Sequence, residues 1–183
     1  MKKILSILIL IAALLALTSC GGDEISVPDG MQLLTDNDKY TVFVPERWVI
    51  DDEKLSMAHD ADYKVNDNYE AFYAQIKIST STVDEDANIE AYANEYIEKF
   101  KNEYGDSFEL GSGIQDYKKG TVSAGKEISF SLKKGKSKDL YRVTFMKKGT
   151  NMIEISYFAN EVEGLFDTNL EDYEATRENI ILK

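Results

Sequence analysis

The chain has 183 residues, a formal net charge of −12, and a composition that is 43% hydrophobic and 30% charged. That length and composition predict one globular domain with a hydrophobic core of its own. A chain this acidic and without a basic stripe is repelled by a phosphate backbone, which argues against a nucleic-acid-binding protein.

The amino terminus carries the most specific motif of the chain. Lys2 and Lys3 precede an apolar run over residues 4–17 that is broken only by Ser6. The run has the length of a signal-peptide core and is shorter than the about 20 residues that a membrane-spanning helix needs. Directly at its end stand four residues that resemble the bacterial lipobox: Leu17, Thr18, Ser19 and Cys20. An ordinary secretory signal that happens to contain a cysteine is the alternative.

The lipobox resemblance implies that residues 1–19 are removed as a signal peptide. It also implies an extracytoplasmic protein, anchored to a bacterial membrane through fatty acids such as palmitate on Cys20. Residues 20–30 then form a short tether that holds a single domain, residues 31–183, close to that membrane. Cys20 is the only cysteine, so the domain has no disulfide, no thiol nucleophile and no cysteine zinc site.

Alternating apolar residues predict the first strands of the domain. A hairpin is expected over residues 32–44, followed by Pro45, which cannot donate to a strand ladder. The only tryptophan, Trp48, comes next and is expected either to plug the sheet edge or to line a binding groove. A central strand is predicted over residues 72–79.

Apolar residues at helical spacing predict a helix from Asn88 to Tyr104. An irregular strand over residues 108–117 and a meander of three antiparallel strands over residues 120–159 are expected to follow. A last helix should open at Asp167 or Thr168. This order of elements predicts an α+β fold, with an antiparallel sheet packed against two main helices.

The pattern resembles the PsbP-like fold, named after an extrinsic subunit of photosystem II. Four features carry the resemblance: Tyr40–Pro45 followed by Trp48, the helix from Asn88, the turn at Ala124-Gly125-Lys126, and the strand at residues 153–158. The resemblance covers roughly residues 31–182 and implies an α/β/α sandwich. It also implies an accessory or binding protein rather than an enzyme, and no functional motif of the family can be assigned to particular positions.

His59 is the only histidine, which excludes a two-histidine metal site and requires any Ser-His-Asp triad to use this residue. The glycine motifs of nucleophile elbows and P-loops are missing. The neighbouring carboxylates supply the oxygen ligands that Ca²⁺ prefers, and the weak metal candidates are His59, Asp60, Asp62 and Asp67. Their spacing is not that of an EF-hand, so a solvated loop is the alternative. No cofactor is expected.

We therefore expect a non-catalytic binding or accessory domain whose partner is an envelope protein or another envelope component. The candidate contact surface consists of Trp48 and one polar–aromatic sheet face, with Tyr73, Gln75, Arg142, Thr144, Glu154 and Phe158. Two alternatives remain open: a carboxylate-dependent hydrolase of the cell envelope and a Ca²⁺-dependent binding module.

Two groups of lysines lie at the predicted ends of the meander. One group is Lys118, Lys119, Lys147 and Lys148, and the other is Lys133, Lys134, Lys136 and Lys138. Either group could contact anionic lipid headgroups. The alternative is that these lysines only keep the hairpin tips soluble.

Overall fold

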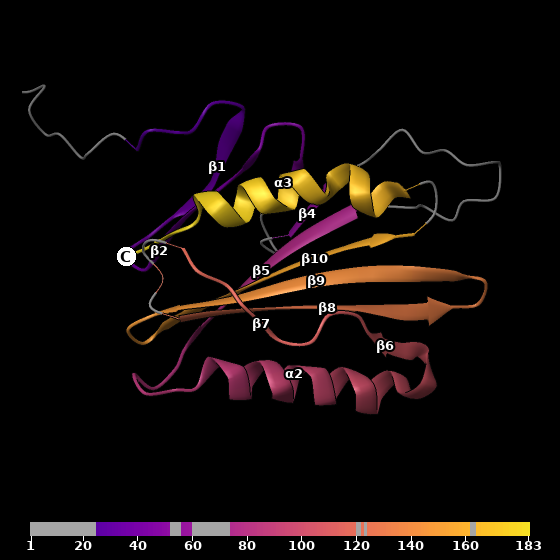
Figure 1. Ribbon diagram of the computed structural model, residues 1–183. Coiled ribbons are helices and arrows are strands. Elements are labelled where there is room, and N and C mark those ends of the chain that lie inside the picture. Colours follow the sequence, from indigo (N-terminus) through magenta and orange to yellow (C-terminus); the bar gives the residue numbers. More distant parts are fainter. Residues whose placement is uncertain (1–24, 52–55, 60–73, 120–121, 123, 162–163) are drawn as a thin grey trace, which may run out of the picture.

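The computed structural model describes residues 25–183 except for residues 52–55, 60–73, 120–121, 123 and 162–163. Two antiparallel sheets and two main helices make up the described part (Figure 1). The α+β class expected from the sequence is therefore confirmed. No helix within the described residues is long and apolar enough to cross a membrane.

The large sheet has the strand order β3-β4-β5-β10-β9-β8-β6, and β7 pairs with β8 beside β6. Every pairing in it is antiparallel. Its strands are β3 (Val49–Asp51), β4 (Ser56–His59), β5 (Ala74–Thr82), β6 (Phe108–Leu110), β7 (Gln115–Asp116), β8 (Ala124–Lys134), β9 (Ser137–Lys148) and β10 (Asn151–Asn160). The predicted meander is thus the hairpin-connected run β8-β9-β10 at the centre of the sheet.

A small sheet with the order β1-β2-β11 lies apart from the large one. The predicted first hairpin forms its strands β1 (Met31–Asp36) and β2 (Tyr40–Pro45). The end of the chain adds β11 (Ile181–Leu182), with Leu182 opposite Tyr40. The small sheet therefore joins the first and last segments of the domain.

Helix α2 (Ile89–Tyr104) forms where the sequence predicts it. The side chain of Asn88 caps it by accepting hydrogen bonds from the backbone N–H groups of Glu90 and Ala91, at 2.9 and 3.2 Å. The helix ends at Gly105, whose φ of 52° suits glycine, and continues into the short η1 (Gly105–Ser107).

Helix α3 (Leu165–Asn179) begins after Gly164, earlier than expected. Thr168, predicted as a possible first residue, lies inside the helix and donates its hydroxyl to the carbonyl of Gly164 at 3.1 Å. The helix therefore starts two or three residues before the expected position, so the expected start was wrong. The hydrophobic pair Leu165 and Phe166, both buried, extends the helix toward its amino end.

The large sheet is covered on both faces, α2 on one and α3 with the small sheet on the other (Figure 1). Along β10, Ile153, Ile155 and Tyr157 enter the core on the α3 side. Val143 and Phe145 of β9 enter the core on the α2 side. The central strands are thus packed on both faces, as the α/β/α sandwich requires.

This packing predicts a large loss of stability when a central side chain is shortened. Ile155 is 0% exposed, so Ile155→Ala should lower the free energy of unfolding by about 2–5 kcal/mol, because it removes buried methyl groups and leaves a cavity. Ile181 is 45% exposed, so Ile181→Ala should change the free energy of unfolding by less than about 0.5 kcal/mol. Urea unfolding measures both variants. Similar effects for the two would contradict the burial of Ile155 in the core on the α3 side.

Candidate functional site

The sheet face predicted as a contact surface is divided between two faces, so that prediction was wrong. The hairpin from β9 to β10 pairs Lys148 with Asn151, which places Arg142 opposite Tyr157 and Phe158 opposite Tyr141. Residues opposite each other share a face, and neighbours along a strand alternate. Arg142 and Thr144 therefore face α3, whereas Glu154, Phe158 and Gln75 face α2.

Trp48 is 2% exposed and belongs to the core on the α3 side, so it is not part of a contact surface. Its indole N–H donates to the carboxylate of Asp172 on α3, which also pairs with Arg47 at 2.5 Å. The structure thus favours the interpretation of Trp48 as a plug. Tyr73 lies outside the described residues.

Arg142 is half-buried and joins the sheet to α3. Its guanidinium pairs with Glu174 at 3.3 Å and lies 3.8 Å from Glu127. Glu127 also accepts from the Thr144 hydroxyl at 2.8 Å and from the guanidinium of Arg177. Arg177 in turn lies over the ring of Tyr117, 4.7 Å from its centroid. This network connects β8, β9 and α3. Because both acidic partners of Arg142 belong to it, Arg142 has a structural role.

The described residues do not form a metal site with the predicted metal candidates. His59 ends strand β4, and Asp60, Asp62 and Asp67 lie outside the described part of the chain. In the described part, no group of three or more His, Cys, Asp or Glu side chains is arranged to hold a metal ion. The Ca²⁺ module therefore stays a prediction.

Three lysines of the first lysine group donate hydrogen bonds to backbone carbonyls. Lys119 donates to the carbonyls of Arg177 and Ile180 at the end of α3, at 3.1 and 2.9 Å. Lys147 is 5% exposed and donates to the carbonyls of Glu85 and Ala87, and Lys148 donates to that of Leu182 at 2.8 Å. These contacts hold the three ammonium groups within the fold, which argues against lipid contact by Lys119, Lys147 and Lys148.

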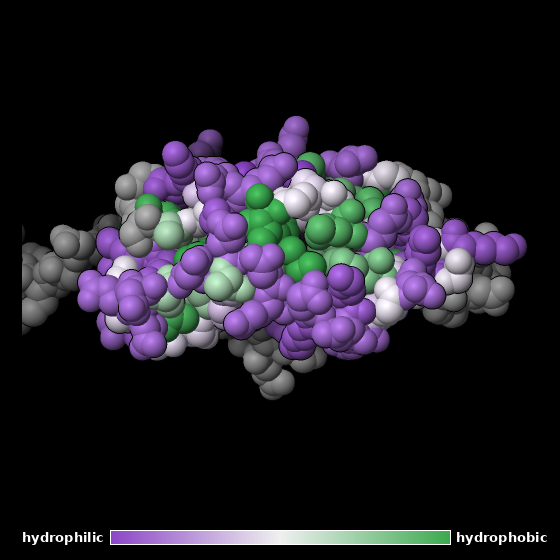
Figure 2. All heavy atoms as spheres, turned by 60° about the horizontal axis from the view of Figure 1, so that its bottom comes forward, coloured by the Kyte–Doolittle hydropathy of each residue, from purple (hydrophilic) through white to green (hydrophobic). Residues whose placement is uncertain are grey.

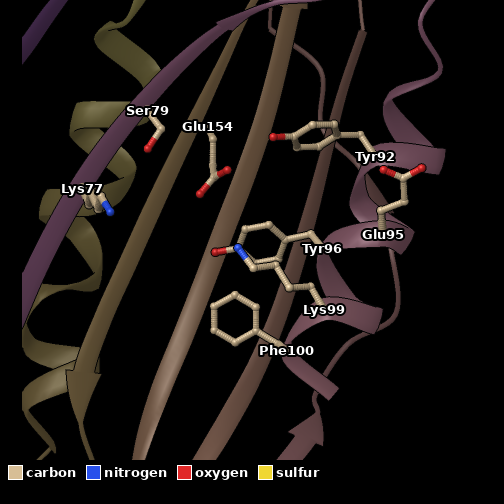
Figure 3. Close-up of a pocket in the computed structure, with 8 residues that line it drawn as sticks. All are labelled: Lys77, Ser79, Tyr92, Glu95, Tyr96, Lys99, Phe100 and Glu154. Atoms are coloured by element: carbon tan, nitrogen blue, oxygen red, sulfur yellow. The ribbon is translucent and has the colours of Figure 1, made fainter. Parts of the chain in front are cut away.

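A recess opens on the α2 side of the sheet, where the helix leaves part of the sheet uncovered. It has a volume of about 440 Å³ and lies between α2 and the strands β5 and β10. Figure 3 shows the eight residues that line it: Lys77, Ser79, Tyr92, Glu95, Tyr96, Lys99, Phe100 and Glu154. This recess is the candidate functional site.

One flank of α2 forms the aromatic wall of the recess. Tyr92, Tyr96, Lys99 and Phe100 fall on one side of the helix because they are three or four residues apart. The rings of Tyr92 and Tyr96 meet the buried ring of Phe145 edge-on, with centroids 5.4 and 5.3 Å apart. The wall is therefore held in place by the core beneath it.

Glu154 forms the base of the recess. It stands on β10 between Ser79 of β5 and the fully buried Phe145 of β9. Burial raises the pKa of its carboxyl, against the opposing effects of Lys77, a hydrogen bond with Tyr96, and Lys99. A partly desolvated carboxylate beside two ammonium groups can bind either a hydrogen-bond donor or, once protonated, an acceptor.

The two tyrosines respond to the same environment. Burial, together with Glu154, raises the pKa of both Tyr92 and Tyr96, so their hydroxyls stay protonated and remain hydrogen-bond donors at neutral pH. In Figure 3 both rings point from α2 toward Glu154, while Lys77 and Ser79 approach from β5. The recess thus combines an aromatic wall, two ammonium groups and two carboxylates, those of Glu95 and Glu154.

A second and larger groove runs along the other flank of α2. It has a volume of about 860 Å³ and is bounded by α2, η1 and β6, with Ile97, Phe108, Leu110 and Ile114 among its lining residues. Figure 2, seen from the side of α2, shows hydrophobic surface gathered near the middle of this face. The groove lacks the buried charge that marks the recess.

Sequence reasoning missed most of the recess. The sequence places Glu154 on the candidate contact surface, but it predicts Tyr92, Tyr96 and Phe100 only as part of the apolar face of a helix. One signal was available in the sequence. The apolar face of this helix carries large aromatic side chains, with tyrosines rather than aliphatic residues at positions 92 and 96. Tyrosines suit a wall with one wet side.

Comparisons with known proteins support the fold. No family model and no curated protein matches the chain. A Pseudomonas aeruginosa protein of unknown function has a similar structure, with a TM-score of 0.53 and 12% identity over 84% of this chain and 97% of that one. The solution structure of PsbP from the cyanobacterium Synechocystis is similar with a TM-score of 0.52 and 12% identity, over 90% of this chain and 98% of that one. The chain therefore has a PsbP-like α+β fold, as its sequence pattern predicted.

Proposed function

We propose that this protein is a lipid-anchored extracytoplasmic binding protein without catalytic activity, and that its ligand occupies the recess. The anchor is supported by three features of the amino terminus: the two lysines at positions 2 and 3, the apolar run over residues 4–17, and the lipobox-like residues 17–20. The binding role is supported by the recess between α2, β5 and β10. The PsbP-like fold alone assigns neither a ligand nor a partner.

The single observation that carries the binding role is Glu154 at the base of the recess. Burial disfavours its charged form, so an ionised carboxylate at this position reduces the stability of the fold. Its cross-strand neighbours, Ser79 and Phe145, do not require a charge. Groups that cost stability and line a cavity are typical of binding sites.

The lining indicates the chemistry of the ligand. Lys77 and Lys99 suit an anionic group, while Glu154 suits a hydroxyl or amide donor. The faces of Tyr92 and Tyr96 offer an amphipathic wall for a ring with polar edges. A volume of about 440 Å³ lies within the usual range of small-molecule sites. We therefore propose an acidic saccharide unit of the cell envelope, such as a fragment of peptidoglycan.

A carboxylate-dependent hydrolase is the second candidate, because the recess contains two carboxylates, Glu95 and Glu154. A carboxyl with a raised pKa, as Glu154 has, suits a general acid. In Figure 3, however, the carboxylate of Glu95 lies along the helix, apart from that of Glu154. A hydrolase of this kind would need both carboxylates directed at the ligand. A binding role needs only Glu154 to face the ligand and accounts for the same lining residues.

Titration with soluble muropeptides, which carry sugar rings and carboxylates, tests the recess. In the protein produced without residues 1–19 and with Cys20→Ser, backbone amide NMR signals of β5, α2 and β10 should shift at the recess. Lys77→Ala combined with Lys99→Ala should weaken the affinity at least about tenfold, which corresponds to about 1.4 kcal/mol. Lys101→Ala, on the same helix but outside the recess, is the matched control and should bind like the parent.

Two results would contradict the binding proposal. One is the absence of shifts at millimolar muropeptide, and the other is equal binding by the double variant and the parent. Signals of cleaved muropeptide that grow with time, and that Glu154→Gln abolishes, would replace the binding role with the hydrolase.

Replacing Cys20 tests the anchor. Cys20→Ser removes the only thiol that can accept the lipid, so cells supplied with radiolabelled palmitate should label the parent protein but not the variant. Ser19→Ala keeps a small residue before the cleavage site and should leave the palmitate labelling unchanged. Palmitate labelling of the Cys20→Ser protein would contradict lipidation at this position.

The raised pKa of Glu154 predicts a pH-dependent effect of Glu154→Gln. The folded state binds more protons than the unfolded state between the unfolded and folded pKa values, so stability falls as pH rises through that window. Glu154→Gln avoids this loss and should stabilise the protein at pH 7.5. The gain should shrink as the pH falls toward about 4.3, the ordinary pKa of glutamate.

Urea unfolding at both pH values measures this effect. Glu46→Gln removes the same charge at an exposed position and corrects for the general acidity of the chain. A gain for Glu154→Gln that equals the control, or that grows on acidification, would show that Glu154 is not destabilised by burial.

A further inference from the structure

The charged side chains of the recess are divided between its two ends. Helix α2 runs antiparallel to β5, because the chain reverses in the connection between them (Figure 1). Earlier residues of α2 therefore lie beside later residues of β5. Figure 3 shows Tyr92 at the level of Ser79, and the amine of Lys99 further along the recess with that of Lys77.

The two ends are separated by a similar distance on both walls. We call Ser79, Tyr92, Glu95 and Glu154 the acidic end of the recess, and Lys77 and Lys99 the basic end. Glu95 and Lys99 are four residues apart on α2, which is about 6 Å along the helix axis. Ser79, which is opposite Glu154, is two residues from Lys77 on β5, which is about 7 Å along the strand.

The two carboxylates of the acidic end lie on either side of Tyr92. In Figure 3 the ring of Tyr92 stands between the carboxylates of Glu95 and Glu154. Burial raises the pKa of the Tyr92 hydroxyl, and the charges of Glu154 and Glu95 raise it further, so both carboxylates act on this side chain. An aromatic ring flanked by two carboxylates attracts a cation through its face and through both charges. The acidic end therefore suits an ammonium group.

The charges at both ends are available to a ligand. In the described part of the chain, no ion pair involves the two lysines or the two glutamates of the recess. By contrast, Lys101 lies on the other flank of α2 and pairs with Glu98 at 3.4 Å. A ligand can therefore pair with the charges of the recess without breaking an ion pair of the fold.

The charge balance argues against a ligand that is only anionic. When all four groups are ionised, the charges of the two lysines and two glutamates cancel, and the whole chain has a formal net charge of −12. The protein then repels an anionic ligand at long range, and the acidic end repels it on contact. A ligand with both an ammonium and a carboxylate group is attracted at both ends.

We infer that the recess binds a zwitterionic part of its ligand, with a primary ammonium at the acidic end and a carboxylate at the basic end. This inference rests on the proposed binding function and specifies its ligand. Among peptidoglycan fragments, a stem peptide that ends in lysine has this chemistry. Its side-chain amine and its carboxylate are joined by a flexible chain of five carbon atoms, which can span the two ends.

Two muropeptides that differ by one charge test this inference. The probes are N-acetylmuramyl-alanyl-glutamyl-lysine and the same compound with its lysine amine acetylated. The protein is produced without residues 1–19 and with Cys20→Ser, and the affinity is measured from backbone amide NMR shifts. The free amine should bind at least about fivefold more tightly than the acetylated form, because acetylation removes the ammonium charge.

Charge-removing variants locate the amine in the recess. Glu95→Gln combined with Glu154→Gln keeps the size of both side chains and should bind the two probes with affinities within about twofold of each other. Glu98→Gln combined with Glu103→Gln removes two charges from α2 outside the recess. This matched control corrects for the general acidity of the chain and should keep the preference of the parent for the free amine.

The orientation of the ligand has its own readout. Nuclear Overhauser contacts from the methylene group beside the lysine amine should reach the ring of Tyr92 at the acidic end. Phe100 lines the recess next to Lys99, at the basic end. Contacts of this methylene group with Phe100 instead of Tyr92 would show the opposite orientation and overturn the inference.

The remaining outcomes separate the inference from the proposed function. Equal affinity for the two probes, with shifts at the recess, overturns the inference and leaves the binding function intact. A preference for the free amine that persists without the charges of residues 95 and 154 also overturns the inference. Absence of shifts with both probes at millimolar concentration refutes the binding function, and the inference with it.

Discussion

The register of the hairpin between β9 and β10 is the constraint on which the rest of the structure depends. A two-residue loop at Gly149 and Thr150, with Gly149 at a φ of 58°, pairs Lys148 with Asn151. This pairing sets the face of each side chain on the two central strands. Ile153, Ile155 and Tyr157 then build one core, and Val143 and Phe145 build the other. A shift by one residue would exchange the faces of β10 and leave both cores incomplete.

The same register creates the recess. It turns Glu154 to the α2 side, beside Ser79, while α2 packs chiefly over β8 and β9. The sheet is wider than one helix, so β5 and β10 stay partly uncovered at the flank of Tyr92 and Tyr96. On the opposite face, α3 and the small sheet together provide the cover, and Trp48 fills the core between them. The candidate site thus follows from the unequal covering of the two faces.

Local patterns in the sequence were sufficient to predict the main elements, but not the short strands β3 and β11 or how the faces of the elements combine. Alternation located β8, β9 and β10, and the cap at Asn88 located α2. Whether Arg142 and Glu154 share a face depends on the number of residues in the turn that joins their strands, which a pattern within one strand does not contain. The contacts of Glu127 with Arg177, and of Trp48 with Asp172, join residues 50 and 124 positions apart, so local reasoning could not find them.

The functional account depends above all on where the mature chain begins. In the proposed function, an anchor at Cys20 holds the domain outside the cytoplasm, where the recess can meet an envelope ligand. Mass spectrometry of the amino-terminal peptide of the protein isolated from its native membranes tests this most directly. The account predicts a chain that begins at Cys20 and carries a diacylglyceryl group on its sulfur. A mature chain that begins at another residue, or an unmodified Cys20, would contradict it.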